Sequence, residues 1–552
     1  MRHSKKLILL LCVACFTAAC NLNQQSSIAE NTHHQIPHLQ KQGNVTRLIV
    51  EDKPFIILGG ELGNSSFTSV EYMEPVWPRL KAMNLNTVLA PVYWELIEPE
   101  KGVYNFDLLD TLIGEARKHN MKLVLLWFGS WKNSMSSHAP AWVKTNQKTY
   151  PRVKDDNGIS HEILTPFSEE NLQADVSAFS ALMSHLKETD SHEHTVIMVQ
   201  PENEIGMLPT ARDYHPLANE KFYSDVPQEL IQYMVAHKDE LTPEFYAVWE
   251  KNGFKTNGNW ETVFGKGLHT DELFMAWYFA QFTEKVTAAG KAIYQLPMFV
   301  NAALNAPGKK PGEYPSAGPL PHVMDVWIAA APSIDFLSPD FYNPDFQHWN
   351  DLYTRRGNTL FIPEHKFDNT VAAKAAFAIG HYEAIGFSPF SIESVPDPEE
   401  EDLGKMYHLI AQLTPLIAAN QGYGKIEGVL LDKENTETKF VLGNYEFTAK
   451  HSHTLAWEIA AKNEIWKPAG AIFIQTDENE FYMAGAGITA TFKNLQNPSL
   501  HVGILKNEEG RFENNEWKII RHMNGDQTHQ GRHVRIFHGD YSIQRIALYN
   551  YE

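Results

Sequence analysis

Residues 195–206 read Thr-Val-Ile-Met-Val-Gln-Pro-Glu-Asn-Glu-Ile-Gly, an apolar and β-branched run that ends in acidic and amide side chains. Residues 357–365, Gly-Asn-Thr-Leu-Phe-Ile-Pro-Glu-His, have the same construction and end in Glu364. Short apolar runs bounded by turn residues are typical of buried strands. The two stretches therefore predict two buried strands that carry Asn203, Glu204 and Glu364 at their carboxyl ends.

Six further apolar runs separated by helical-period segments complete a set of eight candidate strands, at 55–58, 87–90, 123–127, 298–300, 334–337 and near Phe387. Alternating strands and helices indicate a parallel sheet. Eight such units close most simply into a (β/α)8 TIM barrel, whose active site lies at the carboxyl ends of the strands. An open doubly wound sheet is the alternative, but no GxGxxG or phosphate-binding loop follows any strand. We expect the barrel to span residues 46–423.

Two regions depart from the barrel pattern. Residues 207–295 are longer than a barrel connection needs and are rich in aromatic side chains, so we expect an elaborated loop on the catalytic face. From residue 424 to 552 the pattern changes to short alternating strands with turn signals such as Gly443-Asn444, which predicts an appended antiparallel β-sandwich domain. This domain either buttresses the barrel or binds carbohydrate on its own.

The N-terminus has the features of an export signal. Basic residues precede an apolar run from Leu7 to Phe16, and Ala18-Ala19-Cys20 follows. This resembles a lipoprotein signal peptide over residues 1–20 with Cys20 as the lipidated residue; a plain signal peptide cut near Ala19 is the alternative. Residues 21–45 are polar and predict a flexible tether. We therefore expect an exported outer-membrane lipoprotein, periplasmic or surface-facing, that meets the membrane through its lipid anchor.

Net charge and metal-ligand spacing exclude several function classes. The formal net charge is −20, with no basic stripe, which argues against nucleic acid and against a strongly anionic polysaccharide as partners. His192-Glu193-His194 lacks the helical spacing of a zinc motif, and the acidic run 397–402 lacks the EF-hand pattern. We read both as solvated loops and expect neither a metal nor a cofactor. The oligomeric state is left open.

Two carboxylates on distant strands of one barrel can face each other across a sugar. A retaining glycosidase needs such a pair, one protonated to assist the leaving group and one ionised to attack the anomeric carbon. Asn203 could hydrogen-bond the sugar 2-hydroxyl. A single strand-end Glu would more simply end a strand in a solvated loop, whereas two of them, one preceded by Asn, favour catalysis.

Several motifs form a recognisable pattern. Those around the second strand are Asn86-Thr87-Val88, Trp94, Glu98-Pro99, Gly102, Tyr104 and Phe106. Those after later strands are Pro140-Ala141-Trp142 and the segment from His194 to Gly206. Together they resemble glycoside hydrolase family 35, the β-galactosidases of a large clan of (β/α)8 retaining enzymes. The resemblance covers roughly residues 46–395. It implies that Glu204 is the acid/base, Glu364 the nucleophile, Asn203 a contact to the terminal sugar, and Tyr342 the side chain that orients the nucleophile.

Departures from the family pattern concentrate around the sugar pocket. Pro91 stands where a pocket tyrosine is usual, Glu95 departs from the second-strand motif, and Trp131-Lys132-Asn133 replaces Ala-Glu-Trp. As further substrate-binding side chains we predict Glu61, Trp94, Trp131 and Asn133; for Trp94 and Trp131, packing in the core is an equal alternative.

Together these observations predict a retaining, exo-acting β-galactosidase that releases terminal β-D-galactose from plant-type oligo- or polysaccharides such as xyloglucan. A β-glucosidase, a β-mannosidase or an α-L-arabinopyranosidase would use the same mechanism on another sugar. A catalytically silent glycan-binding lipoprotein is the alternative from a different class, but a silent barrel has no need of both Glu204 and Glu364.

Overall fold

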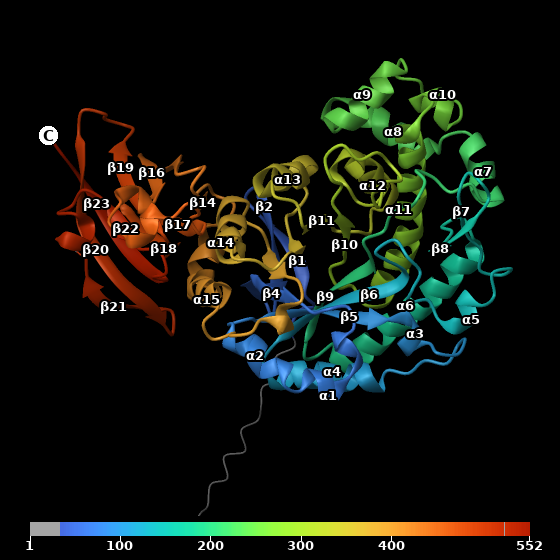
Figure 1. The fold of residues 1–552 in the computed structure, drawn as a ribbon, viewed down its shortest axis with the longest axis horizontal. Helices are drawn as coiled ribbons and strands as arrows, with labels where there is room; N and C mark the ends of the chain where they lie inside the picture. The colour runs from blue at the N-terminus through green and yellow to red at the C-terminus, as the bar shows by residue number, and fades with distance from the viewer. Residues whose placement is uncertain (1–33, 524) are drawn as a thin grey trace, which may run out of the picture. The chain divides into compact units, whose positions relative to one another are not determined.

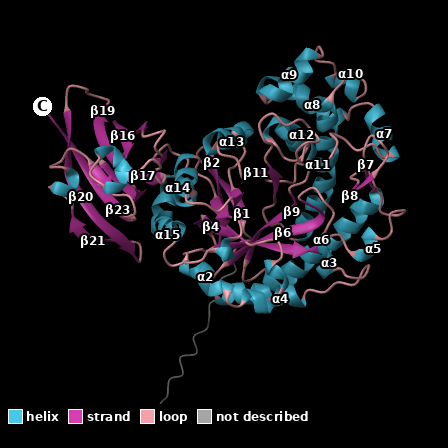
Figure 2. Cartoon of the chain, in the orientation of Figure 1, coloured by secondary structure: helices cyan, strands magenta, loops and turns pink. Residues whose placement is uncertain are grey.

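The computed structural model describes residues 34–523 and 525–552, and its central element is a closed parallel barrel (Figures 1 and 2). Eight strands pair in the order β10-β11-β12-β13-β4-β5-β6-β9. A parallel bridge between Val199 and Met298, with the Val199 amide 3.1 Å from the Pro297 carbonyl oxygen, joins β9 to β10 and completes the circle. The predicted TIM barrel is confirmed. Its strands are β4 Ile57–Glu61, β5 Thr87–Tyr93, β6 Lys122–Lys132, β9 Val196–Asn203, β10 Phe299–Ala303, β11 Phe336–Phe341, β12 Ile362–His365 and β13 Gly386–Pro389.

A helix follows each barrel strand and covers its outer face. Helix α4 shows the pattern that drives this packing: Leu109, Leu112, Ile113 and Ala116 recur at helical spacing and are buried. These helices are α2 Val76–Ala82, α4 Asp107–Lys118, α6 Glu169–Asp190, α11 Leu268–Ile293, α12 Met324–Ala330, α13 Phe346–Tyr353, α14 Val371–His381 and α15 Asp402–Asn420. Short elements in the connections are α1 Val70–Met73, α3 Trp94–Ile97, α5 Ala141–Lys144 and the hairpin β7 Arg152–Lys154 and β8 Ser160–Leu164.

The long insertion after β9 forms four helices rather than an irregular loop. They are α7 Pro216–Tyr223, α8 Gln228–Ala236, α9 Pro243–Lys251 and α10 Trp260–Phe264. Their aromatic side chains pack on one another and on α11; the Trp260 ring, for example, meets that of Phe274 edge-on at 5.4 Å. Figure 1 shows this group in green beside α11 and α12. The aromatic residues of 207–295 are therefore largely core residues of an inserted helical layer.

Two antiparallel sheets follow the barrel, as predicted for the C-terminal region. One has the order β14-β17-β18-β23-β20-β21 and the other β15-β16-β19-β22. Apolar side chains from both sheets, including Phe440, Phe447, Phe473 and Phe481, form a separate core between them. Their strands are β14 Ile426–Leu431, β15 Glu437–Leu442, β16 Tyr445–His451, β17 Ala469–Asp477, β18 Glu480–Ala486, β19 Ile488–Asn494, β20 His501–Glu513, β21 Glu516–His522, β22 Val534–Ile536 and β23 Ser542–Tyr551.

The region before the barrel differs in part from the predicted tether. A three-stranded sheet, β1 His38–Gln42, β2 Val45–Val50 and β3 Lys53–Phe55, begins inside residues 21–45. Strand β1 is polar and half-exposed, but its pairing with β2 satisfies its backbone groups, so a polar composition does not prevent a strand here. The predicted signal peptide and Cys20 lie outside the described residues. Among the described helices, none combines the length and the apolar character that crossing a bilayer requires.

Candidate active site

Glu204 and Glu364 are brought together at the carboxyl ends of β9 and β12. Both side chains are buried, and oxygens of Glu204, Glu364 and Asp340 lie within 4.8 Å of one another. Glu61, at the end of β4, joins them and hydrogen-bonds Glu364. Four carboxyl groups from four strands thus meet at one end of the barrel, where active sites of this fold lie.

The backbone around Glu204 is held in an unusual conformation. Glu202 and Glu204 have φ angles of 63° and 44°, in the left-handed region that non-glycine residues rarely adopt. The Glu204 amide donates to Asn301 Oδ1 at 2.9 Å, and Asn301 in turn donates to Asp340 Oδ2 at 2.6 Å. Strained residues persist where the surroundings hold them and are frequent at active sites.

The end of β6 supplies a cation and an amide to Glu204. Asn133 Nδ2 donates to Glu204 Oε2, and Lys132 Nζ lies 3.8 Å from the same oxygen. Glu202 points away from the carboxyl cluster and accepts a 2.7 Å hydrogen bond from the Trp131 backbone amide. That bond ties the Lys132-Asn133 segment to the strand that carries Glu204.

Glu364 receives two hydrogen bonds that favour its ionised form. Tyr342 donates its hydroxyl to Glu364 Oε1, and the Glu61 carboxyl group donates a second hydrogen bond. Burial, then the neighbouring charge of Glu204, raises the pKa of Glu364 to about 7, against the opposing effects of Lys132 and these two donors. Burial and the charge of Glu364 raise the pKa of Glu61 well above its usual range. Glu61 is therefore the protonated partner that donates to Glu364.

Asn203, the last residue of β9 and the neighbour of Glu204 in the chain, has an unpaired side-chain amide. Its side chain is fully buried, and within the described part of the chain neither its Nδ2 nor its Oδ1 has a hydrogen-bond partner. Buried amides normally find partners because leaving one unpaired costs about 1–3 kcal/mol. Both atoms therefore lack the partner that a buried amide needs, and a sugar hydroxyl, which donates and accepts, suits them.

The structure places two predicted binding residues in the core instead. Trp131 is fully buried, donates from Nε1 to the Leu164 carbonyl oxygen at 3.1 Å and packs against the Phe282 ring. Trp94 is equally buried and donates to Glu98 Oε2 at 2.8 Å. Their prediction as sugar contacts is wrong, and the alternative of core packing holds.

Three site residues were not predicted: Lys132, Asn301 and Asp340. Asn301 and Asp340 also follow apolar runs, the signal that pointed to Glu204 and Glu364. The predicted strands ended at residues 300 and 337, whereas β10 and β11 run on to Ala303 and Phe341.

A TIM barrel in which two buried carboxylates face each other beside a free amide is the arrangement typical of glycoside hydrolases. Residues 47–272 match the family model described as glycosyl hydrolases family 35, which confirms the resemblance seen in the sequence. The match includes Glu61 and Glu204 and ends before β12. Residues 403–535 match a second model, a domain of unknown function, DUF5597.

Solved structures with a similar chain trace include β-galactosidases and a β-amylase. The β-galactosidase of Marinomonas ef1 is 15% identical, with 66% of this chain and 60% of that chain covered and a TM-score of 0.44. The β-galactosidase of Bacillus circulans sp. alkalophilus is 14% identical, with 66% of this chain and 57% of that chain covered and a TM-score of 0.45. The β-amylase catalytic domain of Paenibacillus polymyxa is 13% identical, with 64% of this chain and 97% of that chain covered and a TM-score of 0.43. The chain thus spans about 60% of the β-galactosidases, and likenesses this distant identify no substrate. Comparison with curated protein sequences finds no match.

Proposed function

We propose that the protein is a retaining, exo-acting β-galactosidase that releases terminal β-D-galactose from plant-type oligo- or polysaccharides such as xyloglucan. The observation that carries the proposal is the short separation between Glu204 and Glu364, whose nearest oxygens lie within 4.8 Å. Retaining enzymes hold their carboxyl groups about 5–5.5 Å apart, whereas inverting enzymes need about 6.5–9.5 Å to admit a water. The family 35 match supports the choice of galactose.

In the first step of this mechanism, ionised Glu364 attacks the anomeric carbon while protonated Glu204 gives its proton to the departing glycosidic oxygen. Hydrogen bonds from Tyr342 and Glu61 hold Glu364 in place and stabilise its charge before attack. Asn203 is positioned to bond the sugar 2-hydroxyl, a contact that strengthens as positive charge develops on the ring. A covalent galactosyl–Glu364 ester and the free leaving group result.

In the second step, Glu204 takes a proton from a water molecule while the oxygen of that water attacks the anomeric carbon of the ester. The bond to Glu364 breaks, and galactose leaves with the configuration it had in the substrate. Lys132 Nζ lies 3.8 Å from Glu204 Oε2, next to the oxygen that takes the proton.

A panel of 4-nitrophenyl glycosides tests the sugar, and proton NMR of the first-formed galactose tests retention. We expect the β-D-galactoside to be cleaved fastest and β-galactose to appear before mutarotation. Glu364→Gln should lower turnover by several orders of magnitude without loss of fold. A variant with the wild-type rate, or α-galactose as the first product, would refute the mechanism.

The replacement of the family's Ala-Glu-Trp by residues 131–133 favours one alternative, another β-glycoside as the preferred substrate. Lys132 and Asn133 contact Glu204 directly, so they change the surroundings of the terminal sugar. Faster cleavage of the β-glucoside, β-mannoside or α-L-arabinopyranoside in the same panel would establish this alternative.

We also propose that the protein is exported and anchored to the outer membrane through Cys20. The support is the basic, apolar and small-residue order of residues 2–20. Metabolic labelling with a radioactive fatty acid tests it: wild type should carry the label, and Cys20→Ser should lose it.

A further inference from the structure

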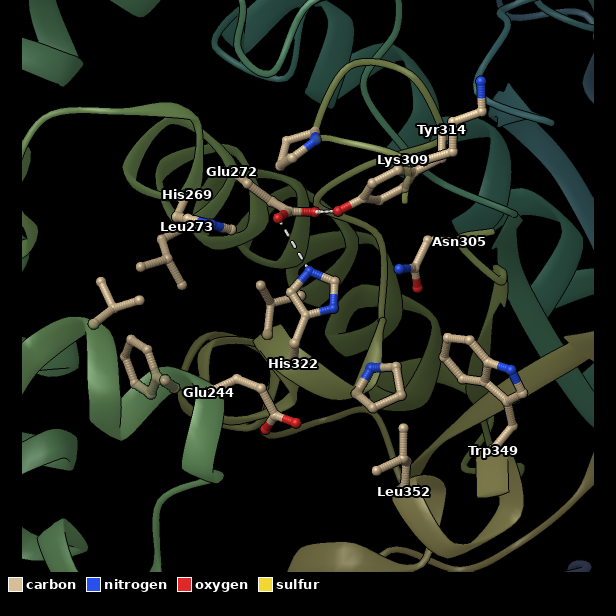
Figure 3. A pocket seen from close by; sticks show the side chains of 15 residues that line it. Glu244, His269, Glu272, Leu273, Asn305, Lys309, Tyr314, His322, Trp349 and Leu352 are labelled. Carbon is tan, nitrogen blue, oxygen red and sulfur yellow. Dashed lines mark hydrogen bonds and ion pairs between the residues drawn. The ribbon is translucent and has the colours of Figure 1, made fainter. Parts of the chain in front are cut away.

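A cavity that the proposed mechanism does not use opens among the loops at the catalytic end of the barrel. Its volume is about 460 Å³, within the ~300–1,000 Å³ range of ligand pockets. Helices α9, α11 and α13 and the connection after β10 contribute its lining (Figure 3). The residues that matter here are Glu272, Asn305, Tyr314, His322 and Trp349.

One wall of this cavity is built on the two catalytic segments. Ser316, in the connection after β10, exchanges backbone hydrogen bonds of 2.7 and 3.3 Å with Met207, three residues beyond Glu204. The carbonyl oxygen of Asn305 accepts a 3.2 Å hydrogen bond from Asn343, the neighbour of Tyr342. The cavity therefore adjoins the segments that carry the acid/base and the nucleophile's partner.

Both acidic side chains of the cavity are paired with cations. Glu272 accepts a 2.8 Å hydrogen bond from the Tyr314 hydroxyl and forms a 3.0 Å ion pair with His322 (Figure 3). Burial acts to lower the pKa of His322, but the charge of Glu272 and the hydrogen bond to it together outweigh burial and raise that pKa. Glu244, on the opposite wall, is paired with Arg355 at 2.9 Å. With both carboxylates compensated in this way the cavity suits a neutral ligand, and Lys309, which also lines it, can donate to a sugar hydroxyl.

The lining also includes an indole ring and polar atoms that can hydrogen-bond a ligand. Trp349 lies at one side of the cavity with Asn305 near it (Figure 3). Asn305 Oδ1 is buried and has no hydrogen-bond partner within residues 34–523 and 525–552. Sugars combine an apolar ring face, which stacks on indole, with hydroxyls that bond amides and imidazoles.

We propose that this cavity binds neutral sugar residues on the leaving-group side of the scissile bond, so that the enzyme acts on galactose attached to an oligosaccharide chain. Glu204 protonates the leaving oxygen, so the departing chain must pass the segment that follows Glu204, and that segment supports the cavity wall. The inference rests on the proposed function, because it assigns the leaving-group side from the acid/base role of Glu204.

The experiment compares kcat/KM on 4-nitrophenyl β-D-galactoside with kcat/KM on a galactosylated xyloglucan fragment and a galactan trisaccharide. Trp349→Ala should lose at least tenfold more on the better oligosaccharide than on the nitrophenyl substrate, and Asn305→Ala should show a smaller loss of the same kind. Trp457→Ala, which removes a half-exposed Trp from the connection between β16 and β17, is the matched control and should change kcat/KM on neither substrate type. Equal losses on both substrate types, or no loss, would overturn the inference.

A binding measurement separates failure of the inference from failure of the proposed function. Galactose-free xyloglucan fragment and galactobiose are titrated calorimetrically into wild type, Trp349→Ala and Trp457→Ala. If wild type cleaves no β-galactoside, the proposed function is refuted, and Trp349-dependent binding of either probe still supports a sugar site in the cavity. If wild type cleaves the nitrophenyl galactoside but neither binds nor prefers either oligosaccharide, only the cavity inference is overturned.

Discussion

Replacing Glu364 by Gln should stabilise the folded protein at neutral and alkaline pH while it abolishes turnover. Burial and the charge of Glu204 raise the pKa of Glu364 from its ordinary 4.5 to about 7. The folded state therefore holds this proton more tightly than the unfolded state. The stabilising contribution is complete below about pH 4.5 and is lost as the pH rises towards 7.

The expected magnitude follows from the size of that shift. At 1.36 kcal/mol per pH unit, the cost of ionising Glu364 in the folded protein reaches about 3 kcal/mol above pH 7. Glutamine does not titrate and keeps the size of the side chain, so Glu364→Gln removes this cost. For a chain of this length, whose unfolding entropy is about 1 kcal/mol per kelvin, Tm should rise by about 3 °C at pH 8.

Differential scanning calorimetry between pH 4.5 and 8 measures the difference in Tm between the variant and wild type. The difference should be near zero at pH 4.5 and should grow through neutrality. Glu188→Gln, at an exposed position on α6, is the control and should show no such growth. The same difference at both ends of the pH range, or a less stable variant at pH 8, would refute the reasoning.

Three further predictions concern neighbouring side chains. Lys132 lowers the pKa of Glu364, so Lys132→Met should move the acid limb of the pH profile of kcat/KM upward by about one pH unit and lower kcat/KM at pH 6 about tenfold. Lys132→Arg keeps the charge and should retain the wild-type profile. Asn203→Ala should lower kcat about 10²-fold or more with an unchanged Tm, and a normal kcat would contradict its assigned contact to the sugar. Trp131→Ala should lower the free energy of unfolding by about 3–5 kcal/mol in urea titrations. If the variant changed KM and left the free energy of unfolding unchanged, Trp131 would be a sugar contact and not a core residue.

The barrel was predictable because its strands are buried on both faces and therefore appear as uninterrupted apolar runs. All eight runs lie in or beside observed strands, although the first was predicted at 55–58 and β4 occupies Ile57–Glu61. The strand-end motifs also placed Glu204 and Glu364 at the same end of the barrel. That location follows from parallel pairing alone and needs no knowledge of side-chain direction.

Side-chain direction is what the sequence could not supply. Successive side chains of a strand alternate between faces, so a shift of one residue reverses which of them point inward. The pairing of β6 with β9 shifts register between Trp127 and Lys132, the interval that contains Trp131. This irregularity turns Trp131 into the core and brings Lys132 and Asn133 to Glu204. The inserted helices α7 to α10 were also missed. Their aromatic side chains were read as residues of a loop, whereas they pack against one another as a core.

The close packing of α14 against the C-terminal sheets affects how the polypeptide can be divided. A Cβ on Gly380 of this helix would lie 2.6 Å from the Gly428 Cα in β14, and one on Gly470 in β17 would lie 2.6 Å from the Ala373 Cα. Backbones this near leave room for hydrogen alone, and α14 joins the strand of Glu364 to β13. The DUF5597 match likewise begins in α15, a barrel helix, and runs into the sheets. Deletion from residue 424 onward would expose the alanine-rich face of α14 to solvent. The barrel and the C-terminal sheets should therefore unfold in one transition, and relatives that have this barrel should also have the sheets.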